Sequence, residues 1–158
     1  MKKTILKSVL IAILVGTGFI SCSSDPTVSN DNAIVSKPTP PGLTGLFYRE
    51  NGTLSYSTVS NPLAKASSKT IFGINGSSNV IEIRLTSLAV GTYTIGSLNK
   101  FYYKKPLTTS TWTAFTGSVT ITSNALGKLS GTYTMTSGTG NSSVNSINGF
   151  FELIPINP

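Results

Sequence analysis

Few side chains in this 158-residue chain are suited to acid–base or nucleophilic chemistry. The chain has no histidine and a single cysteine, which excludes Ser-His-Asp and Cys-His sites and histidine-based zinc sites. The five carboxylates are Asp25, Asp31, Glu50, Glu82 and Glu152. A glycoside hydrolase needs two carboxylates across a cleft, whereas Glu82 beside Arg84 indicates a solvated ion pair between strands. We therefore expect no enzymatic activity, no metal site and no cofactor.

The densest group of side chains suited to binding is the run from Lys100 to Lys105, with Trp112 shortly after it. If this run is a strand, its side chains alternate between a buried and an exposed face. The candidate ligand contacts are Tyr102, Lys104, Lys105 and Trp112. Such side chains suit an acidic envelope glycan or a lipid headgroup, because rings stack on sugars and lysines pair with anions. The sequence favours the simpler interpretation of this run, an edge strand that lysines protect from aggregation.

The only cysteine, Cys22, ends a leader with the layout of a secretory signal peptide. Three lysines precede an apolar run from Ser8 to Ile20, which is shorter than the roughly 20 residues of a membrane-spanning helix. The residues before Cys22 resemble the lipobox of bacterial lipoproteins in its looser Bacteroidota form, with Phe19 in place of the usual leucine. We expect removal of residues 1–21 and lipid attachment at Cys22, the alternative being secretion with a free thiol.

Residues 22–42 are rich in Ser, Asn, Asp and Pro and are expected to form a flexible tether. A strand around Ile34-Val35 is the alternative for this segment. The resemblance to lipoproteins implies sorting to the outer membrane, because no aspartate directly follows Cys22. With Asp25 as the only close acidic residue, an orientation toward the periplasm and one toward the medium are both compatible with the sequence.

The charge of the chain is modest once the leader is set aside. The formal net charge of the whole chain is +7, with 12 basic and five acidic residues. Three of the basic residues lie in the leader, so nine remain and the charge falls to +4. This charge does not indicate a nucleic-acid partner, and export argues against one.

From Leu43 onward, apolar and polar residues alternate with the period of half-buried strands. The expected strands cover residues 46–50, 53–59, 70–74, 79–86, 91–95, 101–104, 112–122, 129–136 and 144–154. Asn51-Gly52 predicts a type I′ hairpin between the first two strands. Alternation places Phe115 and Leu153 on buried faces, with Ile81, Ile83 and Val119.

No segment after Cys22 has helical spacing, and the connections are short. About nine strands predict one all-β domain over residues 43–158, either an antiparallel β-sandwich or an up-and-down barrel. One apolar face per strand is compatible with both architectures.

Five short motifs follow one another along the domain: Asn51–Tyr56, Gly91–Ile95, Gly117–Thr122, Ser130–Met135 and Ile147–Phe151. Their order resembles small Bacteroidota-type lipoproteins with an all-β domain of unknown function. The resemblance covers the chain from about Leu46 onward. It implies an exported all-β domain behind a lipobox, and it carries over no catalytic residues.

Together these features predict a lipid-anchored cell-envelope protein that acts as a non-catalytic binding or interaction module. Its expected partners are the membrane, through the anchor, and an envelope glycan or lipid headgroup, and the sequence favours no particular oligomeric state. A lipocalin-like barrel with a small apolar ligand is the alternative, and it requires an open apolar interior. A glycan-active enzyme would require two of Glu50, Glu82 and Glu152 to converge in a cleft.

Overall fold

The computed structural model of the protein describes residues 43–75 and 78–158. This part of the chain consists of strands joined by turns and loops, without helices. The strands are β1 (Gly45–Glu50), β2 (Ser57–Val59), β3 (Leu63–Lys65), β4 (Thr70–Asn75), β5 (Ser78–Arg84), β6 (Gly91–Thr94), β7 (Lys100–Lys104), β8 (Thr111–Ala125), β9 (Lys128–Thr139) and β10 (Ile147–Asn157). Within these residues no helix is long and apolar enough to cross a membrane. The predicted leader, the lipidation site at Cys22 and the tether lie outside the described residues.

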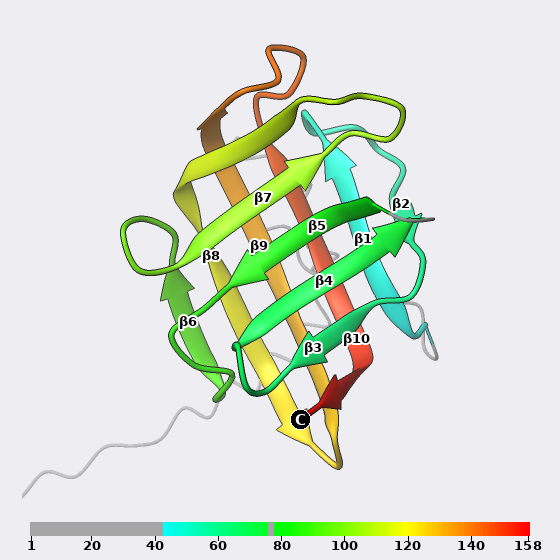
Figure 1. The fold of residues 1–158 in the computed structure, drawn as a ribbon, viewed down its shortest axis with the longest axis vertical. Helices are drawn as coiled ribbons and strands as arrows, with labels where there is room; N and C mark the ends of the chain where they lie inside the picture. Colours follow the sequence, from blue (N-terminus) through cyan, green and yellow to red (C-terminus); the bar gives the residue numbers. More distant parts are fainter. Residues whose placement is uncertain (1–42, 76–77) are drawn as a thin grey trace, which may run out of the picture. The chain divides into compact units, whose positions relative to one another are not determined.

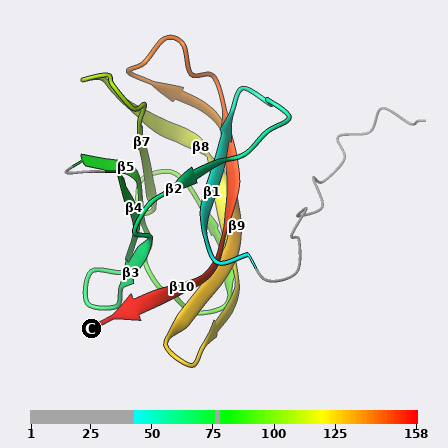
Figure 2. The same ribbon diagram turned by 90° about the vertical axis from the view of Figure 1, so that its right-hand side faces the viewer.

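Seven of the strands close into a barrel in the order β10-β3-β4-β5-β7-β8-β9, and β9 returns to β10 (Figure 1). Neighbouring strands are antiparallel except β10 and β3, which are parallel through Ile156↔Ala64 and Asn157↔Lys65. Figure 2 shows the two sides of the barrel, with β3, β4, β5 and β7 opposite β1, β9 and β10. The all-β prediction is confirmed, and its barrel alternative is observed in a mixed form rather than a purely up-and-down form. The sequence pattern missed the three-residue strand β3.

Strand β10 closes the barrel because it changes partners along its length. Its first residues, from Ile147 to Glu152, pair with β1, and its last two pair with β3. A bulge between Phe151 and Ile154 separates these halves, and Leu153 within it has a φ of +50°. Bulges bend a strand and reverse which side chains face inward. The prediction that Leu153 is buried is therefore wrong, and Ile154 occupies the buried position instead.

Strand β8 changes partners in the same way. Residues 111–114 pair with β7, and residues 118–121 pair with β6. The pairing of β8 with β9 is irregular around Thr116, so the side chains that face the core are at even positions before it and at odd positions after it. Ala114 and Val119 are consequently both buried, although they are five positions apart. The prediction that Phe115 faces the core is wrong, since its side chain is 52% exposed.

The predicted hairpin at Asn51-Gly52 is confirmed at its turn but not in its length. Asn51 and Gly52 have φ values of +51° and +72°, and Thr53 N donates to Glu50 O at 3.0 Å, as in a type I′ turn. The chain then forms a loop before β2 begins at Ser57, which pairs with Tyr48. Directly after β2, Ile74 N donates to Ser60 O, so the β1–β2 hairpin also contacts β4.

Large side chains fill the core of the barrel. Phe101 packs against both Trp112 and Tyr133, with ring centroids 6.3 Å and 5.4 Å apart. Tyr48 packs against Tyr103 with centroids 5.2 Å apart. The largest fully buried side chains are Trp112, Tyr103, Tyr133, Phe101, Phe151, Leu46, Ile71, Ile81, Ile83, Ile121, Leu129 and Met135.

One buried hydrogen bond joins three neighbouring strands. Tyr133 of β9 lies opposite Gly149 of β10, and its hydroxyl donates to Phe47 O of β1 at 2.8 Å. A Cβ at Gly149 would collide with Phe47 O and with the phenol of Tyr133. Burial raises the pKa of Tyr133 well above its ordinary value, so the phenol stays a neutral donor. Because Gly149 has no side chain, the Tyr133 hydroxyl of β9 can reach Phe47 O of β1 across β10.

We predict that Gly149→Ala lowers the free energy of unfolding by about 2–3 kcal/mol, because the added methyl overpacks this crossing. Gly96→Ala is the matched control, since a Cβ there meets no atom within 4 Å, and we expect a change within about 0.5 kcal/mol. Denaturant unfolding followed by tryptophan fluorescence measures both variants. Equal stabilities of the two variants would show that the crossing does not constrain the barrel.

Candidate functional site

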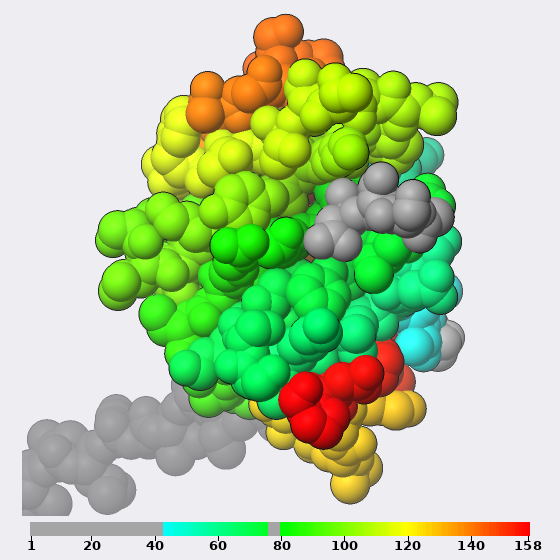
Figure 3. All heavy atoms as spheres, viewed as in Figure 1, coloured from blue at the N-terminus to red at the C-terminus, as the bar shows by residue number. Residues whose placement is uncertain are grey.

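The outer wall of the barrel over β4, β5 and β7 carries a cross-strand row of three half-buried side chains. Phe72 pairs in register with Glu82, and Glu82 pairs with Tyr102. Their chain neighbours, such as Ile81 and Phe101, are buried in the core, so these three face outward. Strand spacing separates Phe72 from Tyr102 by roughly 10 Å. We call the pair Phe72 and Tyr102, with Glu82 between them, the aromatic row. Figure 3 views the molecule from the side of this wall.

A row of cationic side chains lies beside the aromatic row. Lys65, Arg84 and Lys100 share one line of the register, which passes through Thr70. Lys65 Nζ lies 5.6 Å from the centroid of the Phe72 ring, and the Arg84 guanidinium carbon lies 5.2 Å from that of Tyr102. We call Lys65, Arg84 and Lys100 the basic row. Each aromatic ring on this wall therefore has a cation over it.

The wall is positively charged as a whole. Together with Lys104, which follows Tyr102 by two positions, the basic row provides four cations against the single carboxylate of Glu82, a net charge of +3. Arg84 Nε donates to Glu82 Oε1 at 2.6 Å, and this hydrogen bond, reinforced by the charge of Glu82, raises the pKa of Arg84. Within the described part of the chain, no ion pair involves Lys65, Lys100 or Lys104. These three lysines can therefore pair with an external anion.

The structure separates the four ligand contacts predicted from the sequence. Tyr102 and Lys104 lie on the outer wall. Lys105 instead lies at one end of the barrel, where its Nζ donates to Glu50 Oε2 at 2.9 Å. Trp112 is fully buried against Phe101 and has no surface to offer a ligand on this wall. The interpretation of residues 100–105 as an edge strand is wrong, because β7 pairs with β5 on one side and β8 on the other.

Sequence reasoning missed Phe72 and Lys65 as parts of this surface, and it did not count Lys100 among the ligand contacts although the run of residues 100–105 begins there. Period-two alternation places Arg84 on the polar face of its strand, but it assigns no polar face to Phe72, which alternates with Thr70 and Ile74. It also does not say which strands are neighbours. The register across β3, β4, β5 and β7 brings the residues together. The Glu82–Arg84 pair, expected to form between strands, joins positions two residues apart on β5.

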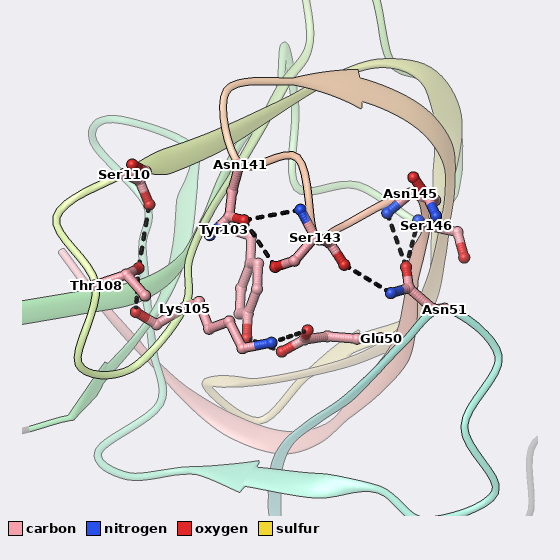
Figure 4. A network of polar contacts seen from close by, with 10 residues as sticks. All are labelled: Glu50, Asn51, Tyr103, Lys105, Thr108, Ser110, Asn141, Ser143, Asn145 and Ser146. Atoms are coloured by element: carbon pink, nitrogen blue, oxygen red, sulfur yellow. Dashed lines mark hydrogen bonds and ion pairs between the residues drawn. The ribbon is translucent and has the colours of Figure 1, made fainter.

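A cluster of hydrogen-bonded polar side chains lies at one end of the barrel, as Figure 4 shows. The Tyr103 hydroxyl donates to Glu50 Oε1 at 2.5 Å, and Lys105 Nζ donates to the other carboxylate oxygen, Oε2. Burial, and secondly the hydrogen bond to Glu50, raise the pKa of the Tyr103 phenol far above its ordinary value. Because both oxygens of Glu50 are occupied and Tyr103 stays neutral, the cluster acts as a clamp between β1 and β7.

Asn51 extends this cluster to the loop between β9 and β10. Its Oδ1 accepts hydrogen bonds from Asn145 N at 2.7 Å and Ser146 N at 3.2 Å, and its Nδ2 donates to Ser143 O at 2.8 Å (Figure 4). The side chain of one turn residue thereby holds the neighbouring loop.

The three glutamates of the barrel have separate partners. Glu50 contacts Tyr103 and Lys105, Glu82 contacts Arg84, and Glu152 accepts a hydrogen bond from Ser130 Oγ at 3.1 Å. The residues that the structure describes contain no group of three or more Cys, Asp or Glu side chains able to hold a metal ion.

We predict that Tyr103→Phe and Glu50→Gln each lower the free energy of unfolding by about 1–3 kcal/mol, because each weakens a part-buried hydrogen bond to a charged group. The double variant should cost less than the two single costs added together, with a coupling of about 1 kcal/mol. Tyr93→Phe is the control, since the Tyr93 hydroxyl bonds Ala89 O at an exposed site. Strictly additive costs in denaturant unfolding would contradict the clamp.

Comparison with known proteins relates the chain to one protein family. No curated protein and no solved structure matches the chain. The family model of a domain of unknown function, DUF6252, matches residues 49–155. This match contains β2 to β9 entirely, together with the end of β1 and most of β10. Because the matched residues make up more than half of the sequence, the chain belongs to the DUF6252 family.

Proposed function

We propose that this protein is a lipid-anchored, non-catalytic binding module of the bacterial cell envelope, and that its outer wall over β4, β5 and β7 binds an acidic glycan. The observation that carries the proposal is the aromatic row beside the basic row, on a wall with a net charge of +3. The exposed parts of the Phe72 and Tyr102 rings provide apolar contact for sugar rings, and the lysines beside them, which have no ion-pair partner among the described residues, pair with carboxylate groups.

The state of the lysines favours a ligand over a purely solvated surface. An exposed cation that already has a carboxylate partner gains little from a second one, whereas Lys65, Lys100 and Lys104 lack an ion-pair partner among the described residues. The rings are only half-exposed and are held in place by neighbouring strands, so little conformational entropy is lost when a ligand binds.

The packing of the barrel supports an external binding face over the lipocalin-like alternative. Trp112, Tyr103, Tyr133 and Phe101 fill the core with no exposed surface or almost none. The separate partners of Glu50, Glu82 and Glu152 likewise favour a binding role over glycan hydrolysis, which needs two carboxylates facing one substrate.

The anchored location is proposed from the leader. Cys22 is the only cysteine, and it follows a short apolar run in a context that resembles a Bacteroidota-type lipobox. On this proposal the mature protein begins at Cys22, is held to the outer membrane by its lipid, and carries the barrel behind residues 23–42.

For the anchor, we expect mass spectrometry of the membrane-extracted protein to show loss of residues 1–21 and a fatty-acylated Cys22. Cys22→Ser should abolish both changes, since the sulfur is the site of attachment. An intact leader, or a mature chain with an unmodified thiol, would refute the anchor.

For the ligand, we expect the purified mature protein in detergent to bind polygalacturonate and not neutral dextran in affinity electrophoresis. The variant Lys65→Gln/Lys100→Gln/Lys104→Gln, with Tyr102→Ser added, should raise Kd about tenfold or more, equivalent to about 1.4 kcal/mol. Lys69→Gln/Lys128→Gln is the control, because it removes two cations that lie outside the wall. Unchanged affinity of the wall variant, or an equal loss in the control, would refute the assignment of the wall.

A further inference from the structure

A shallow groove of about 600 Å³ lies at the end of the barrel opposite the Glu50 clamp. The turn between β3 and β4, the loop after β5, the turn between β8 and β9 and the end of β10 surround it. Its lining is mainly apolar and includes Ala66, Leu88, Ala89 and Ile156. Among the described residues that line it, Lys69 has the only charged side chain.

Two bulky apolar side chains next to the groove point into solvent. Leu126, at the tip of the β8–β9 turn, is 99% exposed, and Val90, directly after Ala89, is 64% exposed. Leu126 has a φ of +53°, which is unfavourable for a residue with a Cβ and is normally taken by Asn or Gly in such a turn. A leucine at this position gains no packing within the domain, so a contact outside the domain would explain it.

The charges around the groove complement an anionic surface. Lys69 lines it, and Lys128 follows the lining residue Gly127 directly. Glu50 lies at the opposite end of the barrel and Glu82 is paired with Arg84. Glu152 keeps its negative charge in its hydrogen bond to Ser130, but it is not among the residues that line the groove. Apolar tips flanked by lysines match the boundary between acyl chains and headgroups of an anionic membrane.

We propose that this end of the barrel docks on the surface of an anionic bilayer, with Leu126 and Val90 entering the acyl boundary and Lys69 and Lys128 at the headgroups. A bilayer fits better than a free amphiphile, because Leu126 is 99% exposed and is not among the residues that line the groove. The docking rests on the proposed anchor: 20 residues separate Cys22 from Leu43 and can extend up to roughly 70 Å, which suffices to bring this end to the membrane. The wall over β4, β5 and β7 then stands clear of the bilayer.

The test compares two leucines at opposite ends of the barrel. Leu107 in the β7–β8 loop is also fully exposed and has a φ of +65°, so it matches Leu126 in environment. The variants Leu126→Cys and Leu107→Cys, each with an acylated Cys22, are labelled with an environment-sensitive fluorophore. They are then reconstituted in vesicles of phosphatidylcholine and phosphatidylglycerol that contain spin-labelled lipid.

We expect at least threefold stronger quenching of the label at position 126 than of the label at position 107. Lys69→Gln/Lys128→Gln should reduce the quenching at position 126. Protein that floats with the vesicles but shows equal quenching at both positions would overturn the docking and leave the anchor standing. Protein that does not float would overturn both. A response of the label at position 126 to free decanoate, but not to vesicles, would overturn the bilayer in favour of a soluble amphiphile.

Discussion

Closure of the barrel depends on one strand, β10, forming hydrogen bonds with three others. The bulge between Phe151 and Ile154 allows β10 to leave β1 and continue beside β3, while β9 stays on its other side. Tyr133 holds the first half of this arrangement through its bond across Gly149 to Phe47 O. Because a closed barrel has no free sheet edges in its ring, this bend gives β3 and β9 a neighbour on the side that would otherwise be an open edge.

The same closure creates the outer wall. Strand β3 has three residues and pairs with β10 on one side and β4 on the other. Its position places Lys65 in line with Arg84 and Lys100, beside the aromatic row. The clamp of Glu50, Tyr103 and Lys105 holds β7, which carries Tyr102, against β1. The proposed binding surface therefore consists of positions that the barrel holds rigidly.

The sequence predicted those features that depend on local alternation. Ile81, Ile83 and Val119 are buried, and Glu82 and Arg84 face outward together, because a regular strand alternates with period two. The predictions that Phe115 and Leu153 are buried were wrong because bulges interrupt that period. Trp112 was assigned to the surface from its closeness in sequence to Tyr102, although cross-strand pairing with Tyr103 places it inside. The alignment of Lys65, Arg84 and Lys100 in one row was not predictable, since it depends on which strands are neighbours.

Nuclear magnetic resonance titration of the mature protein with an acidic oligosaccharide tests the central claim most directly, because it reports every backbone amide at once. If the wall binds the ligand, saturable shifts are confined to β3, β4, β5 and β7 and centre on Phe72, Tyr102 and Lys104, and the groove residues near Leu126 are unchanged. Shifts that centre on the groove or the Glu50 clamp, or the absence of saturable shifts on the wall, would contradict it.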